Sequence, residues 1–163
     1  MLKKLAVGAA ALVATSSAAH AEQLVDSIHF LIPGGAGGGW DGTARGTGEA
    51  LTGAGIVGSA SYENMSGGGG GVAIGHLIEN ADSMHGTLMV NSTPIVIRSL
   101  QGVFPYNFSD LTMIAGTIGD FGALVVTPGS ATTLADLVAA YTADANSIAM
   151  GGGSVPGGMD HLI

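Results

Sequence analysis

Residues Ser27–Gly42, which read SIHFLIPGGAGGGWDG, decide the fold of this chain. The apolar run Ser27–Ile32 favours a buried strand, and Pro33 ends it. A glycine-rich loop follows at positions 34–39, and residues from Trp40 to about Thr52 carry apolar side chains at helical spacing. A strand, a glycine loop and a helix in this order are the repeating unit of an α/β fold.

The same unit recurs along the chain. A second strand is expected over Ser59–Met65, and a helix over Val72–Asn80 follows it after the glycines at 67–71. A third strand is expected over Thr87–Asn91, and Ser92-Thr93-Pro94 after it is a turn or the start of a helix. This alternation predicts an α/β fold with mostly parallel sheets.

The pattern weakens after Pro105. Further strands are expected over residues 111–117, 121–127 and 147–150. Thr133 is expected to cap a helix over Leu134–Thr142, with Asp136 in the position of a capping box. A third glycine loop, Gly151–Gly158, precedes a helix that begins near Met159. The sequence stops inside that helix, so we expect it to be the N-terminal part of a longer protein.

The composition excludes several functions. Glycine supplies 29 of the 163 residues, only 10% of the residues are charged, and cysteine is absent. The chain has four basic and 12 acidic residues, which argues against a nucleic-acid-binding protein and against a polybasic protein that binds membrane surfaces. Disulfides and thiolate chemistry are excluded.

The first 21 residues resemble an export signal. Lys3 and Lys4 precede an apolar run, and Ala19-His20-Ala21 has the small-x-small pattern of a cleavage site. We expect cleavage after Ala21 and an exported protein. Arg45 and Arg98 are then the basic residues that remain against all 12 acids, for a net charge of −10.

The three glycine loops favour anion binding. Each follows an expected strand and precedes an expected helix, which is where open α/β sheets bind their ligands. Glycines let backbone N–H groups approach a ligand closely, and a helix N-terminus adds unpaired N–H groups with a partial positive charge. Alternatively, the glycines serve only the tight turns of an exported structural domain. Asp41 and Arg45 favour an ion pair one helical turn apart, and Asp41 can also shape the first loop.

Nucleotide binding remains as a second reading of the first loop. A P-loop is excluded, because no lysine follows the leader. Gly37–Gly42 matches G-x-G-x-x-G, and Glu63 lies where a ribose-binding acid belongs, as in a dinucleotide-dependent oxidoreductase. Three observations argue against dinucleotide binding. The first fingerprint glycine comes several residues after the strand, and Trp40 and Asp41 place bulk and negative charge near the expected pyrophosphate. The export signal also directs the protein away from the cytosolic cofactor pool.

Catalytic and metal sites have weaker support. Ser154, Asp160 and His161 include the residue types of a hydrolase triad, but the second glycine of G-x-S-x-G is missing. His29, His76 and His85 lack the spacing of metal ligands. Our first expectation is a binding protein without enzymatic activity, cofactor or metal, and a dinucleotide-dependent oxidoreductase stays as the alternative.

Four segments together resemble the substrate-binding proteins of tripartite tricarboxylate transporters, the TctC or Bug family. They are Ile32–Arg45, Glu63–Gly70, Tyr106–Leu111 and Gly151–Leu162, in that order. The resemblance implies a periplasmic receptor of the Venus-flytrap type with two α/β lobes. Residues 22–118 would form the first lobe, and residues 119–163 would begin the second.

The resemblance also implies a ligand and its contacts. Such receptors capture small carboxylates, with di- and tricarboxylates such as citrate as the expected class, and deliver them to one large and one small membrane subunit. Carried over to this sequence, the ligand-binding positions are Gly35, Ala36, Gly37, Gly38, Gly39, Asp41, Ser92, Thr93, Gly153, Ser154 and Gly157, with residues 67–70 as further candidates.

Overall fold

A computed structural model describes residues 22–119, 121–153 and 156–162. The expected leader, residues 1–21, lies outside the described residues. In the described part of the chain, no helix combines the length and the apolar character needed to cross a membrane.

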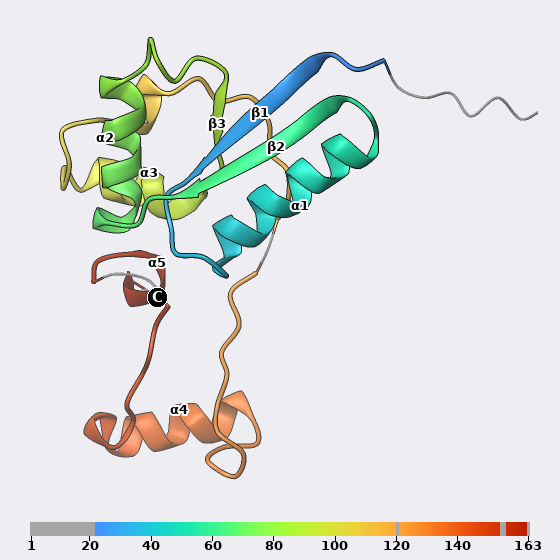
Figure 1. The fold of residues 1–163 in the computed structure, drawn as a ribbon. Coiled ribbons are helices and arrows are strands. Elements are labelled where there is room, and N and C mark those ends of the chain that lie inside the picture. The colour runs from blue at the N-terminus through green and yellow to red at the C-terminus, as the bar shows by residue number, and fades with distance from the viewer. Residues whose placement is uncertain (1–21, 120, 154–155, 163) are drawn as a thin grey trace, which may run out of the picture.

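The centre of the fold is an open, all-parallel sheet (Figure 1). It contains β1 (Val25–Ile32), β2 (Val57–Asn64) and β3 (Thr87–Met89) in the order β2-β1-β3. The expected α/β fold with a parallel sheet is therefore confirmed. Both neighbours of β1 pair with it in parallel, so the loops that follow all three strands emerge at the same edge.

Helix α1 (Gly39–Gly53) covers one face of the sheet (Figure 1). Phe30 and Ile32 of β1 point to this face and form a buried cluster with Ala44 of α1. Gly48 is where the helix lies closest to β2, because a Cβ there would lie 3.0 Å from Cζ of Tyr62. The expected first helix is thus confirmed despite its glycines.

Two more helices lie beside the carboxyl ends of the strands (Figure 1). A single 3-10 turn, η1 (Gly68–Gly70), leads into α2 (Gly71–Glu79), which places Ala73 and Ile74 in the core. Helix α3 (Thr93–Leu100) begins at the predicted Ser92-Thr93-Pro94 signal and buries Ile95.

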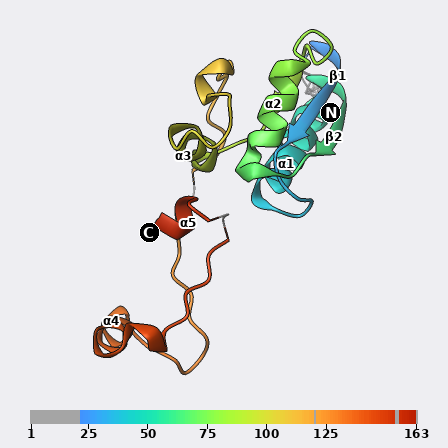
Figure 2. The same ribbon diagram turned by 90° about the vertical axis from the view of Figure 1, so that its left-hand side faces the viewer.

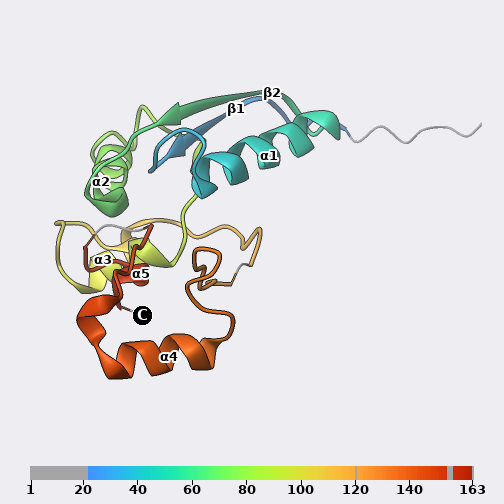
Figure 3. The same cartoon turned by 90° about the horizontal axis from the view of Figure 1, so that it is seen from below.

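After α3, the described chain leaves the sheet and is mostly exposed (Figures 2 and 3). It contains the 3-10 turns η2 (Phe108–Asp110) and η3 (Ala145–Ser147) and the helices α4 (Leu134–Ala143) and α5 (Met159–Leu162). Helix α4 has the predicted capping box: Asp136 N–H donates to Thr133 Oγ1 and Thr133 N–H donates to Asp136 Oδ2.

Three predictions of strands, over residues 111–117, 121–127 and 147–150, are wrong. Residues 111–117 and 121–127 are all described, and none of them is assigned to a strand. At 147–150, Ser147 ends the turn η3 and residues 148–150 are irregular. The physical reason is the lack of a partner, because a strand forms only where a neighbour accepts and donates its backbone hydrogen bonds. Phe121 is 97% exposed, so its apolar character has nothing to pack against.

Candidate functional site

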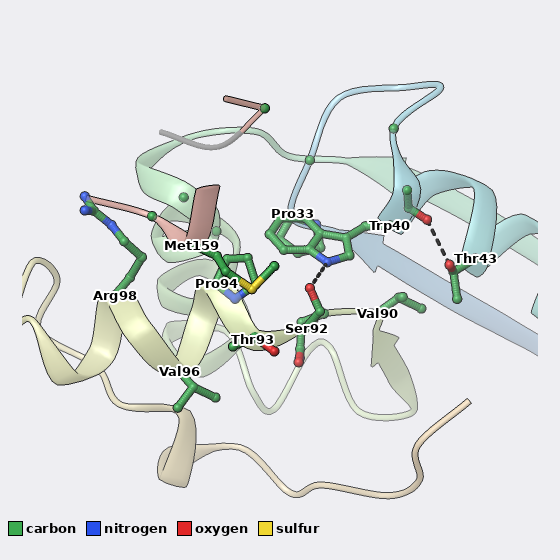
Figure 4. Close-up of a pocket in the computed structure, with 18 of the residues that line it drawn as sticks. Pro33, Trp40, Thr43, Val90, Ser92, Thr93, Pro94, Val96, Arg98 and Met159 are labelled. Atoms are coloured by element: carbon green, nitrogen blue, oxygen red, sulfur yellow. Dashed lines mark hydrogen bonds between the residues drawn. The ribbon is translucent and has the colours of Figure 1, made fainter. Parts of the chain in front are cut away.

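One large cavity, of about 1130 Å³, lies at the carboxyl edge of the sheet (Figure 4). The first glycine loop, the second glycine loop and the residues after β3 supply most of its wall. Residues 115–119 and residues 153 and 158–160 border it from the later part of the chain. The three strand-to-helix connections therefore meet at one place, as the parallel sheet requires.

The expected site residues divide into three groups. Those that line the cavity are Gly35, Gly38, Gly39, Ser92, Thr93 and Gly153. Ala36, Gly37, Asp41 and Gly157 are not lining residues, and Ser154 lies outside the described residues. The further candidates 67–70 all line the cavity.

Asp41 does not line the cavity, but its carboxylate accepts a hydrogen bond from the first glycine loop. Its Oδ2 accepts the Gly37 N–H at 2.8 Å, and its Oδ1 accepts from Arg45 Nε at 2.9 Å and from Asn64 Nδ2 at 3.0 Å. The residue is 5% exposed. Hydrogen bonds from Arg45, Gly37 and Asn64 lower the pKa of Asp41 to about 2. Both expected roles are confirmed, since Asp41 pairs with Arg45 and also shapes the loop.

Trp40 forms part of the cavity wall, a role that the sequence reasoning missed. Its indole N–H donates to Ser92 Oγ at 2.9 Å, which ties the start of α1 to the start of α3 (Figure 4). Gly34 permits this placement, because a Cβ there would lie 3.0 Å from Cε3 of the indole. The available signal was the chain's single tryptophan, directly after the glycine loop.

Three of the helices that begin at this cavity, α1, α2 and α3, have no side-chain hydrogen bond at the N-cap. The N-cap residues are Gly38 for α1, Gly70 for α2 and Ser92 for α3, whose hydroxyl accepts from Trp40 instead. Helices and turns that begin elsewhere are capped by side chains, as α4 is by Thr133 and η2 by Asn107. The cavity is therefore surrounded by helix N-termini without side-chain caps, where an anion can accept hydrogen bonds.

The dinucleotide fingerprint does not have the packing that it requires. Its last glycine normally allows a close approach of helix and strand. A Cβ at Gly42 would meet nothing within 4 Å, and the close approach occurs instead at Gly48. Glu63 lies on the sheet, where its Oε2 is 3.6 Å from Nε2 of His29, and it does not line the cavity.

The histidines of the sequence analysis also lie apart from the cavity. His29, His76 and His85 are not among its lining residues. Within residues 22–119, 121–153 and 156–162, no group of three or more histidine and acidic side chains could hold a metal ion.

Arg98 is a second lining residue that the sequence reasoning did not single out as a contact. Its signal was its rarity, because Arg45 is the other basic residue after the expected leader. Met159 at the start of α5 faces the same space (Figure 4).

Comparisons of the chain with protein-family models, with curated proteins and with solved structures found no match. The fold and the site together define the class: an α/β protein with an open parallel sheet and a cavity at its carboxyl edge.

Proposed function

We propose that this chain is a periplasmic solute-binding receptor that captures a small carboxylate for a tripartite tricarboxylate transporter. Di- and tricarboxylates such as citrate are the proposed ligands, and the large and small membrane subunits of the transporter are the proposed partners. The proposed fold is a Venus flytrap, with residues 22–118 in the first lobe and residues 119–163 in the second.

The observation that carries this proposal is the set of uncapped helix N-termini around one cavity. A carboxylate needs hydrogen-bond donors and positive charge, and three helix starts supply both without lysine. The first glycine loop, the second glycine loop and the loop at 151–158, which carry the resemblance, all contribute lining residues.

The proposed mechanism is capture followed by closure. The N–H groups at the start of α1 and the hydroxyls of Ser92 and Thr93 would bind the carboxylate in the first lobe. The loop around Gly153 would close over it from the second lobe. A net charge of −10 after removal of the leader opposes the approach of anions, so selectivity must come from these local contacts.

The test is calorimetry of the full chain with citrate, succinate and butyrate. A side chain at Gly38 would crowd the carbonyl oxygen of Gly35, which would lie 3.2 Å from the new Cβ, so Gly38→Val is expected to weaken binding. Gly46→Ala is the matched control, because its Cβ meets nothing within 4 Å and the residue does not line the main cavity. Absence of binding by the wild type, or equal affinity in Gly38→Val, would contradict the proposal.

A further inference from the structure

Arg98 carries a positive charge that the described residues do not neutralise. The ion pairs in residues 22–119, 121–153 and 156–162 join Arg45 with Asp41 and His29 with Glu63, so Arg98 belongs to neither. Asp160 lines the same cavity, but one of its carboxylate oxygens accepts the Gly153 N–H at 2.9 Å. Among the described residues that line the cavity, Arg98 is the basic one.

The guanidinium is held by one nitrogen. Nη1 donates to Gln101 Oε1 and to the carbonyl oxygen of Pro156, both at 3.1 Å. Nε is buried and has no hydrogen-bond partner among the described residues. Because Nε is covered by protein and Nη1 is engaged, Nη2 is the guanidinium nitrogen that can donate a charge-assisted hydrogen bond to a carboxylate in the cavity. A hydrogen bond between a guanidinium and a carboxylate is stronger than one between neutral groups, so a carboxylate at Nη2 would gain from the charge of Arg98.

The position of Arg98 suits a second carboxylate, separate from the first. It lies six residues after Ser92, the N-cap of α3, which corresponds to roughly 9 Å along the helix axis. The helix N-termini and Arg98 therefore border the cavity at two separate points. One carboxylate of a short dicarboxylate would lie at the helix starts and the other at the guanidinium.

We propose that Arg98 binds the second carboxylate of the ligand and thereby makes the site selective for di- and tricarboxylates over monocarboxylates. This inference rests on the proposed function of the cavity. A monocarboxylate bound at the helix N-termini leaves Arg98 as it is in the free protein, and gains nothing from it.

A purely structural role for Arg98 is the alternative that the test must separate. Gln101 Nε2 donates to the Gly157 carbonyl oxygen at 2.7 Å, so Arg98 and Gln101 together hold the 156–157 turn against α3. Gln101→Ala removes a contact to this turn and one acceptor of Arg98 Nη1, but it keeps the guanidinium and its charge. It is the matched control for Arg98→Gln, which removes the charge at similar length.

The experiment uses the full chain and two probes of equal carbon number, succinate and butyrate, with tricarballylate as a third. Affinity is measured by calorimetry and by the emission of Trp40, the single tryptophan, which lies in the cavity wall. Arg98→Gln is expected to weaken succinate and tricarballylate binding by roughly 10–100-fold and to change butyrate binding by less than about twofold. Arg98→Lys should recover part of the loss, and Gln101→Ala should leave the preference for succinate intact.

Two results would overturn the inference while the proposed function stands. In one, the wild type binds succinate and butyrate equally and Arg98→Gln changes neither affinity. In the other, Arg98→Gln and Gln101→Ala weaken all three probes alike, which shows that both residues only position the turn. If the wild type binds none of the probes, the proposed function fails and the inference fails with it.

Discussion

The carboxylate of Asp41 folds back onto the loop that precedes its own helix, where Oδ2 accepts the Gly37 N–H at 2.8 Å. Gly37 has a φ of +82°, a conformation that suits glycine. The bond therefore fixes a loop whose backbone would otherwise be free to change. Arg45 and Asn64 hold the other oxygen, so the site begins with a rigid loop, positioned by a residue outside the cavity wall.

Replacing Asp41 should loosen this loop. Asp41→Ala removes the partners of Gly37, Arg45 and Asn64 together, so the thermal midpoint should fall by several degrees and hydrogen exchange at the Gly37 N–H should accelerate. Glu49→Ala is the matched control, because Glu49 is an exposed acid on the same helix. Equal midpoints for the two variants would show that the Asp41 contacts do not support the loop.

The stability contributed by Asp41 should depend on pH. Its pKa is lowered from an ordinary value of 3.8 to about 2 in the folded protein, because its hydrogen bonds favour the charged form. The contribution is therefore fully present above about pH 4 and is lost as the pH falls towards 2. Thermal unfolding of the wild type and Asp41→Asn should differ most above pH 4 and converge near pH 2. A difference that stays constant over this range would contradict the assignment.

Gly48 should tolerate no side chain. A Cβ there would lie 3.0 Å from both Ala60 Cβ and Tyr62 Cζ, and the Tyr62 ring is restrained by stacking on Phe30. Gly48→Ala should destabilise the protein by roughly 1–3 kcal/mol in urea unfolding, because α1 must move away from β2. Gly46→Ala on the open side of α1 should instead stabilise by up to about 1 kcal/mol. Equal effects at the two positions would rule out this close packing.

Trp40 should report on the contact between α1 and α3. Ser92→Ala removes the acceptor of the indole N–H, so acrylamide should quench the emission of Trp40 more strongly than in the wild type. Thr93→Ala is the control, because Thr93 also lines the cavity but does not bond the indole. Quenching that is unchanged in Ser92→Ala would show that the bond does not hold the ring in solution.

The elements of residues 22–100 could be predicted from sequence because their signals are local. The apolar run 27–32, the helix after Trp40 and the Ser92-Thr93-Pro94 start each appear in the structure within a few residues of the expected bounds. The Thr133–Asp136 capping box was predictable for the same reason, since both hydrogen bonds span three residues.

The strands expected at 111–117, 121–127 and 147–150 failed because a strand is a non-local structure. Apolar runs such as 123–126 have strand propensity, but propensity alone does not supply a hydrogen-bonded neighbour. Met113 and Ile114 are 65% and 75% exposed, so these residues do not pack into the core.

The sequence by itself determined the α/β class, the strand-loop-helix order and the scarcity of positive charge, because composition, periodicity and capping are properties of neighbouring residues. Only the tertiary structure decided that Trp40 bonds Ser92, 52 positions away, and that Arg98 lines the same cavity as the first glycine loop. Those relationships depend on the parallel pairing and the order β2-β1-β3 of the sheet, which together bring three loops side by side at one edge. Sheet order arises from packing between distant segments, and no local pattern encodes it.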